Sequence, residues 1–341
     1  MTNSSEDSDI AAKLRRVLVL GATGTIGPAT VAALVARGHD VACLVRPRAG
    51  PGGRLEGAAI AQRLPGADLR FGNVADAGSL ARDGFRGERF DAVVSCLASR
   101  TGTPADAWAI DHRAHLLALE AAKAAGVSHF VLLSAICVQK PLLAFQHAKL
   151  AFEEALMASG LRYSIVRPTA YFKSLSGQVE RVRQGKPFLV FGDGKLTACK
   201  PISDADLADF IAGCLERPER WDRILPIGGP GPAITPLDQA ALLSRLLGRR
   251  VSTRRVPVGL LDAIIFGLTA IGRLSPRLAE KAELARIGRY YATESMLLRD
   301  PETGRYLADA TPEWGTDRLE DYQARLLSGD LQLERGDHAV F

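Results

Sequence analysis

Lys149 and Phe145 lie four residues apart, so on a helix they share one face and can reach the same ligand. A tyrosine at position 145 would place a phenol beside the ammonium group of Lys149, an arrangement suited to reducing a carbonyl. Phe145 has no hydroxyl group, so the usual proton donor for an alcohol–ketone interconversion is missing. Lys149 can still hold ribose hydroxyl groups, or it is a solvated lysine. The candidate catalytic residues are Lys149, Lys173 and Ser134.

A glycine-rich turn indicates a nucleotide cofactor. The apolar run 17–20 precedes the turn and an apolar helical pattern follows it. The unpaired amides and partial positive charge of a helix N-terminus suit a pyrophosphate, and glycines let it approach the backbone. The spacing G-x-x-G-x-x-G differs from the G-x-G-x-x-G fingerprint, so a structural turn without a ligand is the alternative. The candidate phosphate-binding residues are Gly21, Thr23, Gly24, Thr25, Ile26 and Gly27.

Two arginines follow the second expected strand. Arg46 and Arg48 stand where an NAD-dependent enzyme usually has a carboxylate for the ribose 2′-hydroxyl. An arginine attracts a 2′-phosphate instead, so the pattern favours NADPH, unless both arginines are merely solvated. After the third strand, Asn73 is the first candidate to pair with the adenine edge. Asp76 is either a second candidate or the N-cap of the next helix.

Residues after the fourth and sixth expected strands complete the cofactor site. Cys96, Leu97 and Ala98 would let the cofactor pass close to the backbone, and Cys96 is expected to pack rather than to act as a nucleophile. Pro168 and Thr169 end the sixth strand, where they would flank the nicotinamide.

Strands and helices alternate along the first half of the chain. This order predicts an α/β fold with a parallel, doubly wound Rossmann sheet. Ligands of such sheets lie beyond the carboxyl ends of the strands, where the candidate residues are found. The expected strands are 17–20, 40–45, 68–71, 92–96, 130–134 and 163–166, and the expected helices are 26–37, 78–85, 106–125, 143–159 and 177–183.

The second half is less regular and predicts a smaller C-terminal substrate-binding lobe at the edge of the sheet. Segments 188–191 and 224–227 resemble strands, and 204–215 and 236–247 resemble helices. We expect a disordered tail at 1–14, an NADP-binding Rossmann domain at 15–176, and the lobe with a C-terminal extension at 177–341, partly interleaved with the sheet.

Segment 256–271 is strongly apolar, but Pro257 and Asp262 interrupt it and it is too short to span a membrane. It is expected to be a buried or substrate-lining helix. A surface helix in peripheral contact with a bilayer is the alternative.

Composition excludes several classes of protein. With 341 residues, 47% of them hydrophobic, the chain can form a large core. The net charge of +5 is small and the basic residues are scattered, which argues against a nucleic-acid partner. The five cysteines form no C-x-x-C pair and lie beside no histidine cluster, which argues against disulfides and a bound metal. The polar N-terminus lacks the features of a signal or transit peptide.

Longer segments resemble the divinyl chlorophyllide a 8-vinyl-reductase family, within the atypical short-chain dehydrogenase/reductase superfamily. The glycine turn, the Lys149 helix without its tyrosine and the strand end at Pro168 and Thr169 are similar to the superfamily. The narrower resemblance extends from about Arg16 to the C-terminus. It rests on segments 95–102 (SCLASRTG), 132–143 (LLSAICVQKPLL), 191–203 (FGDGKLTACKPIS), 225–231 (LPIGGPG) and 287–296 (IGRYYATESM).

The resemblance implies an NADPH-dependent reduction of the C8 vinyl group of a divinyl chlorophyllide, or of its protochlorophyllide, to an ethyl group. The pathway would be chlorophyll or bacteriochlorophyll synthesis, and the magnesium would belong to the pigment. Because plant members resemble this chain after a transit peptide, a bacterial cytoplasmic enzyme is expected. A flat chlorin with one propionate needs an apolar slot and a cation. Phe145, Phe172, Tyr290 and Tyr291 are candidates for the slot, and Arg100, Lys173 and Lys200 for the cation, unless the two tyrosines simply pack.

A vinyl group conjugated to a macrocycle can accept a hydride at its terminal carbon, and a proton then completes the ethyl group. Lys149 is expected to orient the ribose, and Lys173 or a held water to supply the proton. The rival functions are reduction of another activated alkene and non-catalytic sensing of NADP(H). The sequence does not indicate an oligomeric state.

Overall fold

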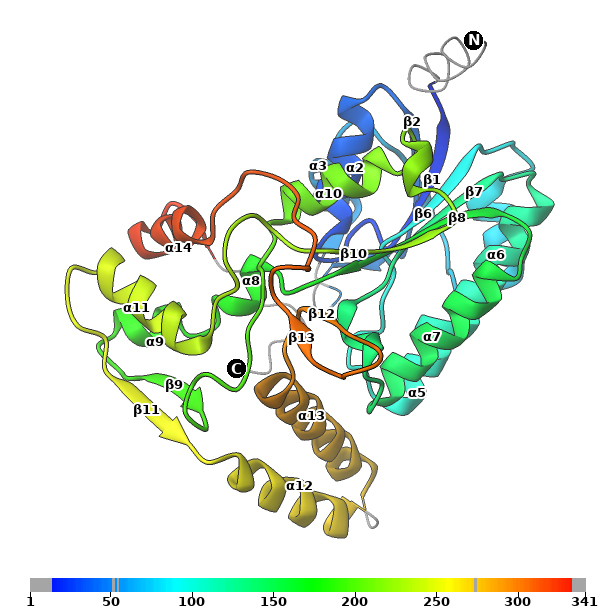
Figure 1. Ribbon diagram of the computed structural model, residues 1–341. Helices are drawn as coiled ribbons and strands as arrows, with labels where there is room; N and C mark the ends of the chain where they lie inside the picture. Colours follow the sequence, from blue (N-terminus) through cyan, green and yellow to red (C-terminus); the bar gives the residue numbers. More distant parts are fainter. Residues whose placement is uncertain (1–13, 51–52, 54, 273–274, 333–341) are drawn as a thin grey trace.

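A parallel sheet of seven strands forms the centre of the computed structural model, which describes residues 14–50, 53, 55–272 and 275–332 (Figure 1). The expected tail at 1–14 lies outside these residues except for Leu14. Strand order is β10-β8-β7-β6-β1-β2-β5, and every pairing is parallel, so the predicted doubly wound sheet is confirmed. The strands are β1 (Arg16–Leu20), β2 (Asp40–Val45), β5 (Asp68–Phe71), β6 (Ala92–Ser95), β7 (His129–Leu133), β8 (Arg162–Pro168) and β10 (Arg223–Ile227).

Helices cover both faces of this sheet (Figure 1). Side chains alternate along a strand, so Val17 and Val19 of β1 enter one core cluster while Leu18 and Leu20 enter the other. The first cluster includes side chains of α2 and α10, and the second includes side chains of α6 and α7. These helices are α2 (Gly27–Ala36), α6 (His115–Ala124), α7 (Ala144–Met157) and α10 (Asp204–Gly213).

Two of the predicted crossover helices contain a π-helical turn. Segment 77–85 is α4 (Ala77–Ser79) followed by η2 (Leu80–Phe85), and segment 104–124 is α5 (Pro104–Ala107), η3 (Trp108–Ala114) and α6. π-Helical turns occur frequently at functional sites. The shorter elements of this half are β3 (Arg48–Ala49), β4 (Leu55–Glu56), α3 (Gly57–Arg63) and η4 (Ile136–Gln139).

The second half of the chain contributes to the sheet and also forms a smaller lobe. Strand β10 and helix α10 belong to the sheet layer, because β10 pairs with β8 and α10 shares a core with α2. The lobe has its own core, in which β9 pairs in parallel with β11. Its elements are α8 (Phe172–Leu175), α9 (Val179–Arg183), β9 (Phe188–Phe191), α11 (Pro236–Leu246), β11 (Thr253–Val256) and α14 (Leu319–Ser328), with η5 (Pro218–Arg220), β12 (Leu298–Arg299) and β13 (Tyr306–Leu307) elsewhere in this half.

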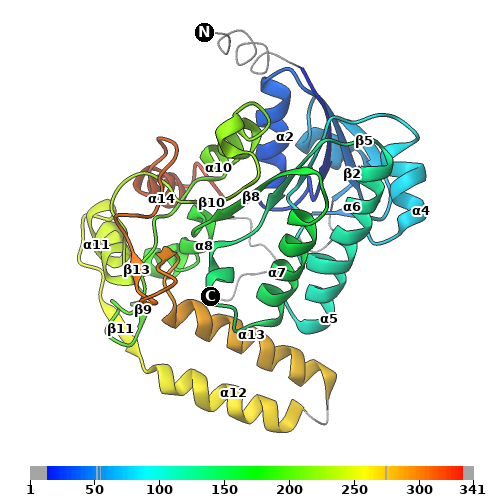
Figure 2. The same cartoon turned by 45° about the vertical axis from the view of Figure 1, so that its right-hand side comes forward.

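The apolar segment near residue 260 is a surface helix, so the expectation of a buried helix is wrong. Helix α12 (Val258–Gly272) has no buried residue. In both views it lies on the outer side of α13 (Pro276–Thr293), away from the sheet (Figures 1 and 2). The helix is exposed because α13 covers only one of its faces. Within the described residues, no helix combines the length and apolarity needed to cross a membrane.

Candidate cofactor and substrate site

The glycine turn lies where the strand order of the sheet reverses. Strand β1 pairs with β2 on one side and with β6 on the other, and ligands of doubly wound sheets bind at this switch point. Gly21 has φ +73°, and a Cβ there would lie 2.5 Å from the carbonyl carbon of Cys96. A Cβ on Gly27 would lie 2.3 Å from the oxygen of Gly21. Gly21 and Gly27 are therefore needed because two backbone segments pack closely at each of them. Gly24 is exposed, so its lack of a side chain leaves room for a ligand.

The N-terminus of α2 is open in a way that fits a diphosphate. Its N-cap residue Ile26 makes no side-chain capping bond, and the first turn contains no acidic residue. The unpaired amides and the positive end of the helix dipole are therefore available to an anion. Thr23 is partly exposed and Thr25 is exposed beside this helix end. The residues present thus fit the phosphates of a dinucleotide.

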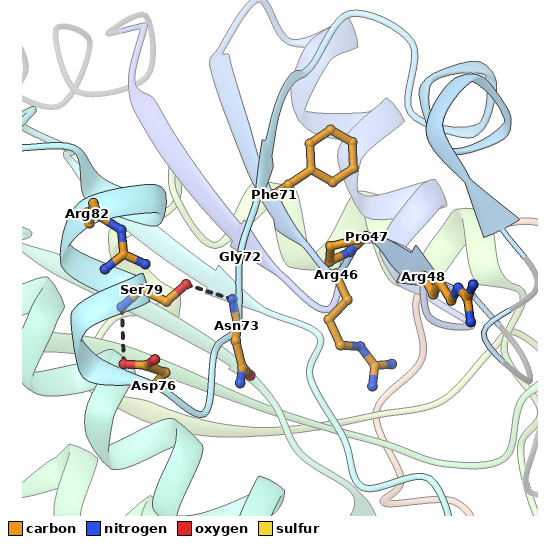
Figure 3. A pocket seen from close by; sticks show the side chains of 9 residues that line it. All are labelled: Arg46, Pro47, Arg48, Phe71, Gly72, Asn73, Asp76, Ser79 and Arg82. Carbon is orange, nitrogen blue, oxygen red and sulfur yellow. Dashed lines mark hydrogen bonds between the residues drawn. The ribbon is translucent and has the colours of Figure 1, made fainter.

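A shallow cavity of about 800 Å³ lies beside the carboxyl ends of strands β2 and β5. Figure 3 shows the basic side chains Arg46, Arg48 and Arg82 around it, together with the half-exposed Phe71. Arg48 pairs with Glu56 at 2.7 Å, and both groups are well exposed. Arg82, a third arginine at the cavity, pairs with Asp83 at 2.8 Å. The lining itself contains three arginines and one carboxylate, Asp76, so its net charge is positive. The cavity is lined by Arg46, Pro47, Arg48, Phe71, Gly72, Asn73, Asp76, Ser79 and Arg82.

The two polar candidates after β5 have different surroundings. The carboxylate of Asp76 accepts hydrogen bonds from the backbone N–H groups of Gly78 and Ser79, so Asp76 is the N-cap of α4 (Figure 3). The side-chain oxygen of Asn73 accepts from the N–H of Ala75 at 3.0 Å. This bond orients the amide so that its NH₂ group can donate to a ring nitrogen of adenine.

Lys149 forms a buried ion pair that the sequence analysis missed. Its ammonium nitrogen lies 3.0 Å from Oδ1 of Asp111, and the two side chains are 11% and 0% exposed. The same Oδ1 accepts a hydrogen bond from the backbone N–H of Ser99. The other oxygen, Oδ2, is buried and has no hydrogen-bond partner among the described residues. Asp111 belongs to the π-helical turn η3, which a helical pattern alone does not reveal.

The hydroxyl hydrogens of Ser134 and Thr169 are already donated within the protein. Ser134 donates to Glu153, which also pairs with Arg167. Thr169 donates to the backbone oxygen of Lys200. Both residues are buried at the carboxyl ends of β7 and β8, and neither presents a free hydroxyl hydrogen there.

The loop after β6 lies against the glycine turn. Cys96 contacts Gly21 through its backbone, and its Sγ lies 3.5 Å from the hydroxyl oxygen of Thr30. Burial raises the pKa of the Cys96 thiol to about 11, which fits packing and not a nucleophilic thiolate. Leu97 is partly exposed and Ala98 is exposed.

Three of the expected substrate contacts point elsewhere. Lys200 is 5% exposed and pairs with Glu313, so its charge is already neutralised. Phe172 is 3% exposed and packs with Leu242 and Leu319. Tyr290 is 4% exposed. These positions are occupied by internal contacts and offer a pigment little surface.

Phe145, another expected substrate contact, is also buried at 9% exposure, and it packs against α13. A Cβ on Gly102 would touch Phe145 and Ile287, so the loop after β6, α7 and α13 meet at this point. Tyr291, one helical turn beyond Ile287, is 40% exposed. Arg100 donates to the backbone oxygen of Gly50 at 3.1 Å, which links this loop to the one after β2.

Lys173 faces a second acidic group that the sequence analysis missed. Burial raises the pKa of Asp204 to about 6, and the nearby charge of Lys173 acts in the opposite direction. Asp111 could have been identified as an acidic residue among apolar neighbours, whereas Asp204 is the first residue of α10, where an acidic residue is ordinary. Among the described residues, no group of three or more His, Cys, Asp or Glu side chains is placed to hold a metal ion.

Known proteins share this sequence and fold. Residues 21–218 match the NAD(P)H-binding family. The chain is 51% identical over 332 residues to the chloroplastic divinyl chlorophyllide a 8-vinyl-reductase of Cucumis sativus, which covers 95% of this chain and 79% of that protein. The protein of the same name from Oryza sativa subsp. indica is 50% identical over 331 residues, covering 95% and 82%. The structure of AtPrR2 with NADP⁺ and (+)pinoresinol has a TM-score of 0.67 at 19% identity, over 92% of this chain and 98% of that chain, and shows the fold alone.

These relatives contradict the expected bacterial cytoplasmic location, because both are named as chloroplast proteins. The expectation rested on the lack of transit-peptide features at the start of the sequence.

Proposed function

Because this chain belongs to the divinyl chlorophyllide a 8-vinyl-reductase family, we propose that it reduces the 8-vinyl group of divinyl chlorophyllide a to an ethyl group, with NADPH as the reductant. The observation that carries this proposal is the extent of the identity. About half of the residues agree over 95% of the chain, so the similarity includes the second half with its own lobe as well as the dinucleotide-binding half. A lobe shared to this degree supports a shared substrate.

The preference for NADPH over NADH rests on the charge of the cavity beside β2 and β5. Arg46, Arg48 and Arg82 bring three guanidinium groups to its rim. A 2′-phosphate gains charge-assisted hydrogen bonds from such groups, whereas the plain 2′-hydroxyl of NADH gains much less.

Titrating the protein with NADPH and with NADH, followed by intrinsic fluorescence, tests this preference. Arg46→Ala should weaken NADPH binding about tenfold, or about 1.4 kcal/mol, and leave NADH binding nearly unchanged. Arg183→Ala is the matched control, because Arg183 is an exposed arginine paired with Glu180 on α9 of the smaller lobe. Equal affinity of the unaltered protein for the two cofactors would contradict the assignment.

The bound dinucleotide would supply a hydride from its reduced nicotinamide. The turn from Gly21 to Gly27 and the open end of α2 hold the phosphates, and Asn73 contacts the adenine. Lys149, fixed by Asp111 at 3.0 Å, orients the ribose next to the nicotinamide. Pro168 and Thr169 form the floor of this end of the cleft. With these contacts, the reactive end of the cofactor would lie beyond β7 and β8.

The pigment would bind between the loop after β6 and helix α13. The 40% exposed ring of Tyr291 provides surface for a flat ring beside the buried Phe145, and Arg100 or Lys173 provides a cation for the propionate. A substrate methyl-esterified at the propionate should therefore bind more weakly. Equal affinity of the acid and the ester would remove the ion pair from the account.

Incubation of the purified protein with NADPH and divinyl chlorophyllide a tests the proposed activity directly. Chromatography should show conversion to a product that is heavier by two hydrogens. Protochlorophyllide with two vinyl groups is the second substrate to compare. Binding of NADPH and pigment without conversion would favour a non-catalytic function instead.

Helix α12 would place the enzyme against an anionic membrane surface. Its outward side chains are apolar, and Leu260, Ile264, Phe266 and Ile271 are 51%, 43%, 78% and 54% exposed. Its acidic residue, Asp262, is paired with Arg289. Exposed basic residues lie on the neighbouring elements, namely Arg254 and Arg255 of β11 and Arg277 and Lys281 of α13. An apolar face beside basic side chains is the combination that binds anionic lipid surfaces.

Co-sedimentation with lipid vesicles tests this contact. The protein should bind vesicles that contain an anionic lipid and not neutral vesicles, and Phe266→Asp should abolish binding. Met157→Asp is the control, since Met157 is an exposed apolar residue on α7. If the protein binds neither kind of vesicle and forms oligomers in solution, α12 is instead an interface between copies of the chain.

A further inference from the structure

The adjacent tyrosines of α13 have different surroundings. The hydroxyl of Tyr290 lies 2.9 Å from the backbone oxygen of Cys137 and 3.1 Å from that of Lys140, and the side chain is 4% exposed. Tyr290 therefore anchors α13 to the loop after β7. Tyr291 is 40% exposed, and its hydroxyl lies 3.9 Å from Sγ of Cys137, a weak partner. The hydrogen of this second phenol is thus not held by a strong acceptor among the described residues.

The hydroxyl of Tyr291 lies near residues that follow two central strands of the sheet. Cys137 belongs to η4, which follows β7, and Tyr171, whose hydroxyl interacts electrostatically with that of Tyr291, follows β8. Both loops are at the carboxyl edge of the sheet, where ligands of this fold bind. Helix α13 also covers Phe145, because Ile287 and Phe145 both border Gly102. A phenol from α13 is therefore near the position at which α7 lacks one.

Of the other groups at this edge that could give a proton, three are already engaged, and Lys173 lies near the carboxyl group of Asp204. The hydrogens of Ser134 and Thr169 go to Glu153 and to the backbone of Lys200. The ammonium group of Lys149 is paired with Asp111.

We propose that Tyr291 is the proton donor of the reduction, in place of the phenol that Phe145 lacks. This assignment rests on the proposed function. As the vinyl π bond breaks, its terminal carbon receives the hydride and the carbon next to the ring receives the proton from Oη of Tyr291. The phenolate left behind regains a proton from solvent after the product leaves. Burial, with the nearby Cys137, raises the pKa of Tyr291, so the phenol keeps its proton at neutral pH until the substrate takes it.

Tyr291→Phe tests the assignment because it removes only the hydroxyl group. We expect kcat to fall about 100-fold or more, the usual contribution of a general acid. Affinity for the pigment, measured without cofactor by fluorescence quenching, should change less than about twofold, because the ring that contacts the pigment stays. Turnover in D₂O should be slower than in H₂O for the unaltered enzyme. The residual turnover of the variant should show a different solvent isotope effect, since another donor acts.

Two further phenols serve as comparisons. Tyr306 lies on β13, and its hydroxyl donates to Glu294 at 2.8 Å. Tyr306→Phe removes this hydroxyl and should leave kcat unchanged. Tyr171→Phe removes the other phenol at the edge of the sheet. A large loss in Tyr171→Phe together with normal turnover in Tyr291→Phe would overturn the assignment to Tyr291.

The outcomes separate this assignment from the proposed function. If the unaltered enzyme reduces the pigment and Tyr291→Phe does so equally well, Tyr291 is not the donor and the function stands. If the unaltered protein reduces no pigment, both fail. If Tyr291→Phe does not fold, Tyr291→His replaces it, because an imidazole can also donate a proton. That variant should retain more activity than Tyr291→Ala, and equal activities would count against the assignment.

Discussion

Replacing Asp111 with asparagine removes the only charge that the structure places against the ammonium of Lys149 within 4 Å among the described residues. Asparagine keeps the shape of the side chain and an oxygen that can accept from the N–H of Ser99. What the variant loses is the negative charge beside a lysine that is 11% exposed. The substitution therefore isolates the electrostatic part of the contact.

The size of the effect follows from burial. Breaking a buried ion pair by removing one partner costs about 3–5 kcal/mol, and we expect the lower figure because the hydrogen bonds persist. Unfolding entropy near 2 cal/mol/K per residue gives about 0.7 kcal/mol/K for 341 residues. A loss of about 3 kcal/mol should then lower Tm by about 4 °C.

Thermal unfolding of Asp111→Asn, Lys149→Met and the double variant checks this reasoning. The double variant should recover most of the stability, because no unpaired charge stays buried. It should not recover cofactor affinity, since Lys149 is what holds the ribose. Glu120→Gln is the control: Glu120 and Lys123 form an exposed pair at 3.4 Å, worth less than about 1 kcal/mol. If Asp111→Asn lowers Tm no more than Glu120→Gln does, the ion pair does not stabilise the fold as calculated.

Two other substitutions test the turn and a buried histidine. In Gly27→Ala, the new Cβ would meet backbone atoms at 2.3–2.5 Å, so cofactor affinity should fall by at least about tenfold. The control is Gly259→Ala, where a Cβ meets nothing within 4 Å and cofactor affinity should stay normal. Equal affinity of the two variants for the cofactor would contradict the role of close packing at Gly27. Burial, aided by the charge of Lys149, lowers the pKa of His115 to about 4. The folded state therefore binds fewer protons than the unfolded state below about pH 6.5, and stability falls as pH falls toward 4. His115→Gln should reduce that dependence by about 1.4 kcal/mol per pH unit, and an unchanged slope in chemical denaturation would show that another group titrates.

The sheet could be predicted from the sequence because its central strands are buried on both faces. Such strands appear as short apolar runs, and Val17 to Leu20 enter both cores as that pattern requires. The same reasoning failed for α12. An apolar helix predicts burial against some neighbour but does not identify that neighbour. Here α13 packs against α12, and no residue of α12 is buried.

The site was predicted in outline because strand ends can be located from local patterns. Partners distant in sequence could not be predicted. Lys200 pairs with Glu313 across 113 positions, and nothing near Lys200 signals that its charge is neutralised. Phe172 is an apolar residue just after a strand end, as a pigment-binding residue would be, but Leu242 and Leu319, which are distant in sequence, enclose it. The contact between Lys149 and Asp111 depends on a π-helical turn, which shifts the register of a helix in a way that periodicity does not show.

The most direct test of the central claim is a single turnover with NADPH carrying deuterium at both positions of the nicotinamide C4. Mass spectrometry of the isolated pigment should find one deuterium in the new 8-ethyl group, at its terminal carbon. A product without deuterium, or an unchanged pigment beside tightly bound cofactor, would contradict the account.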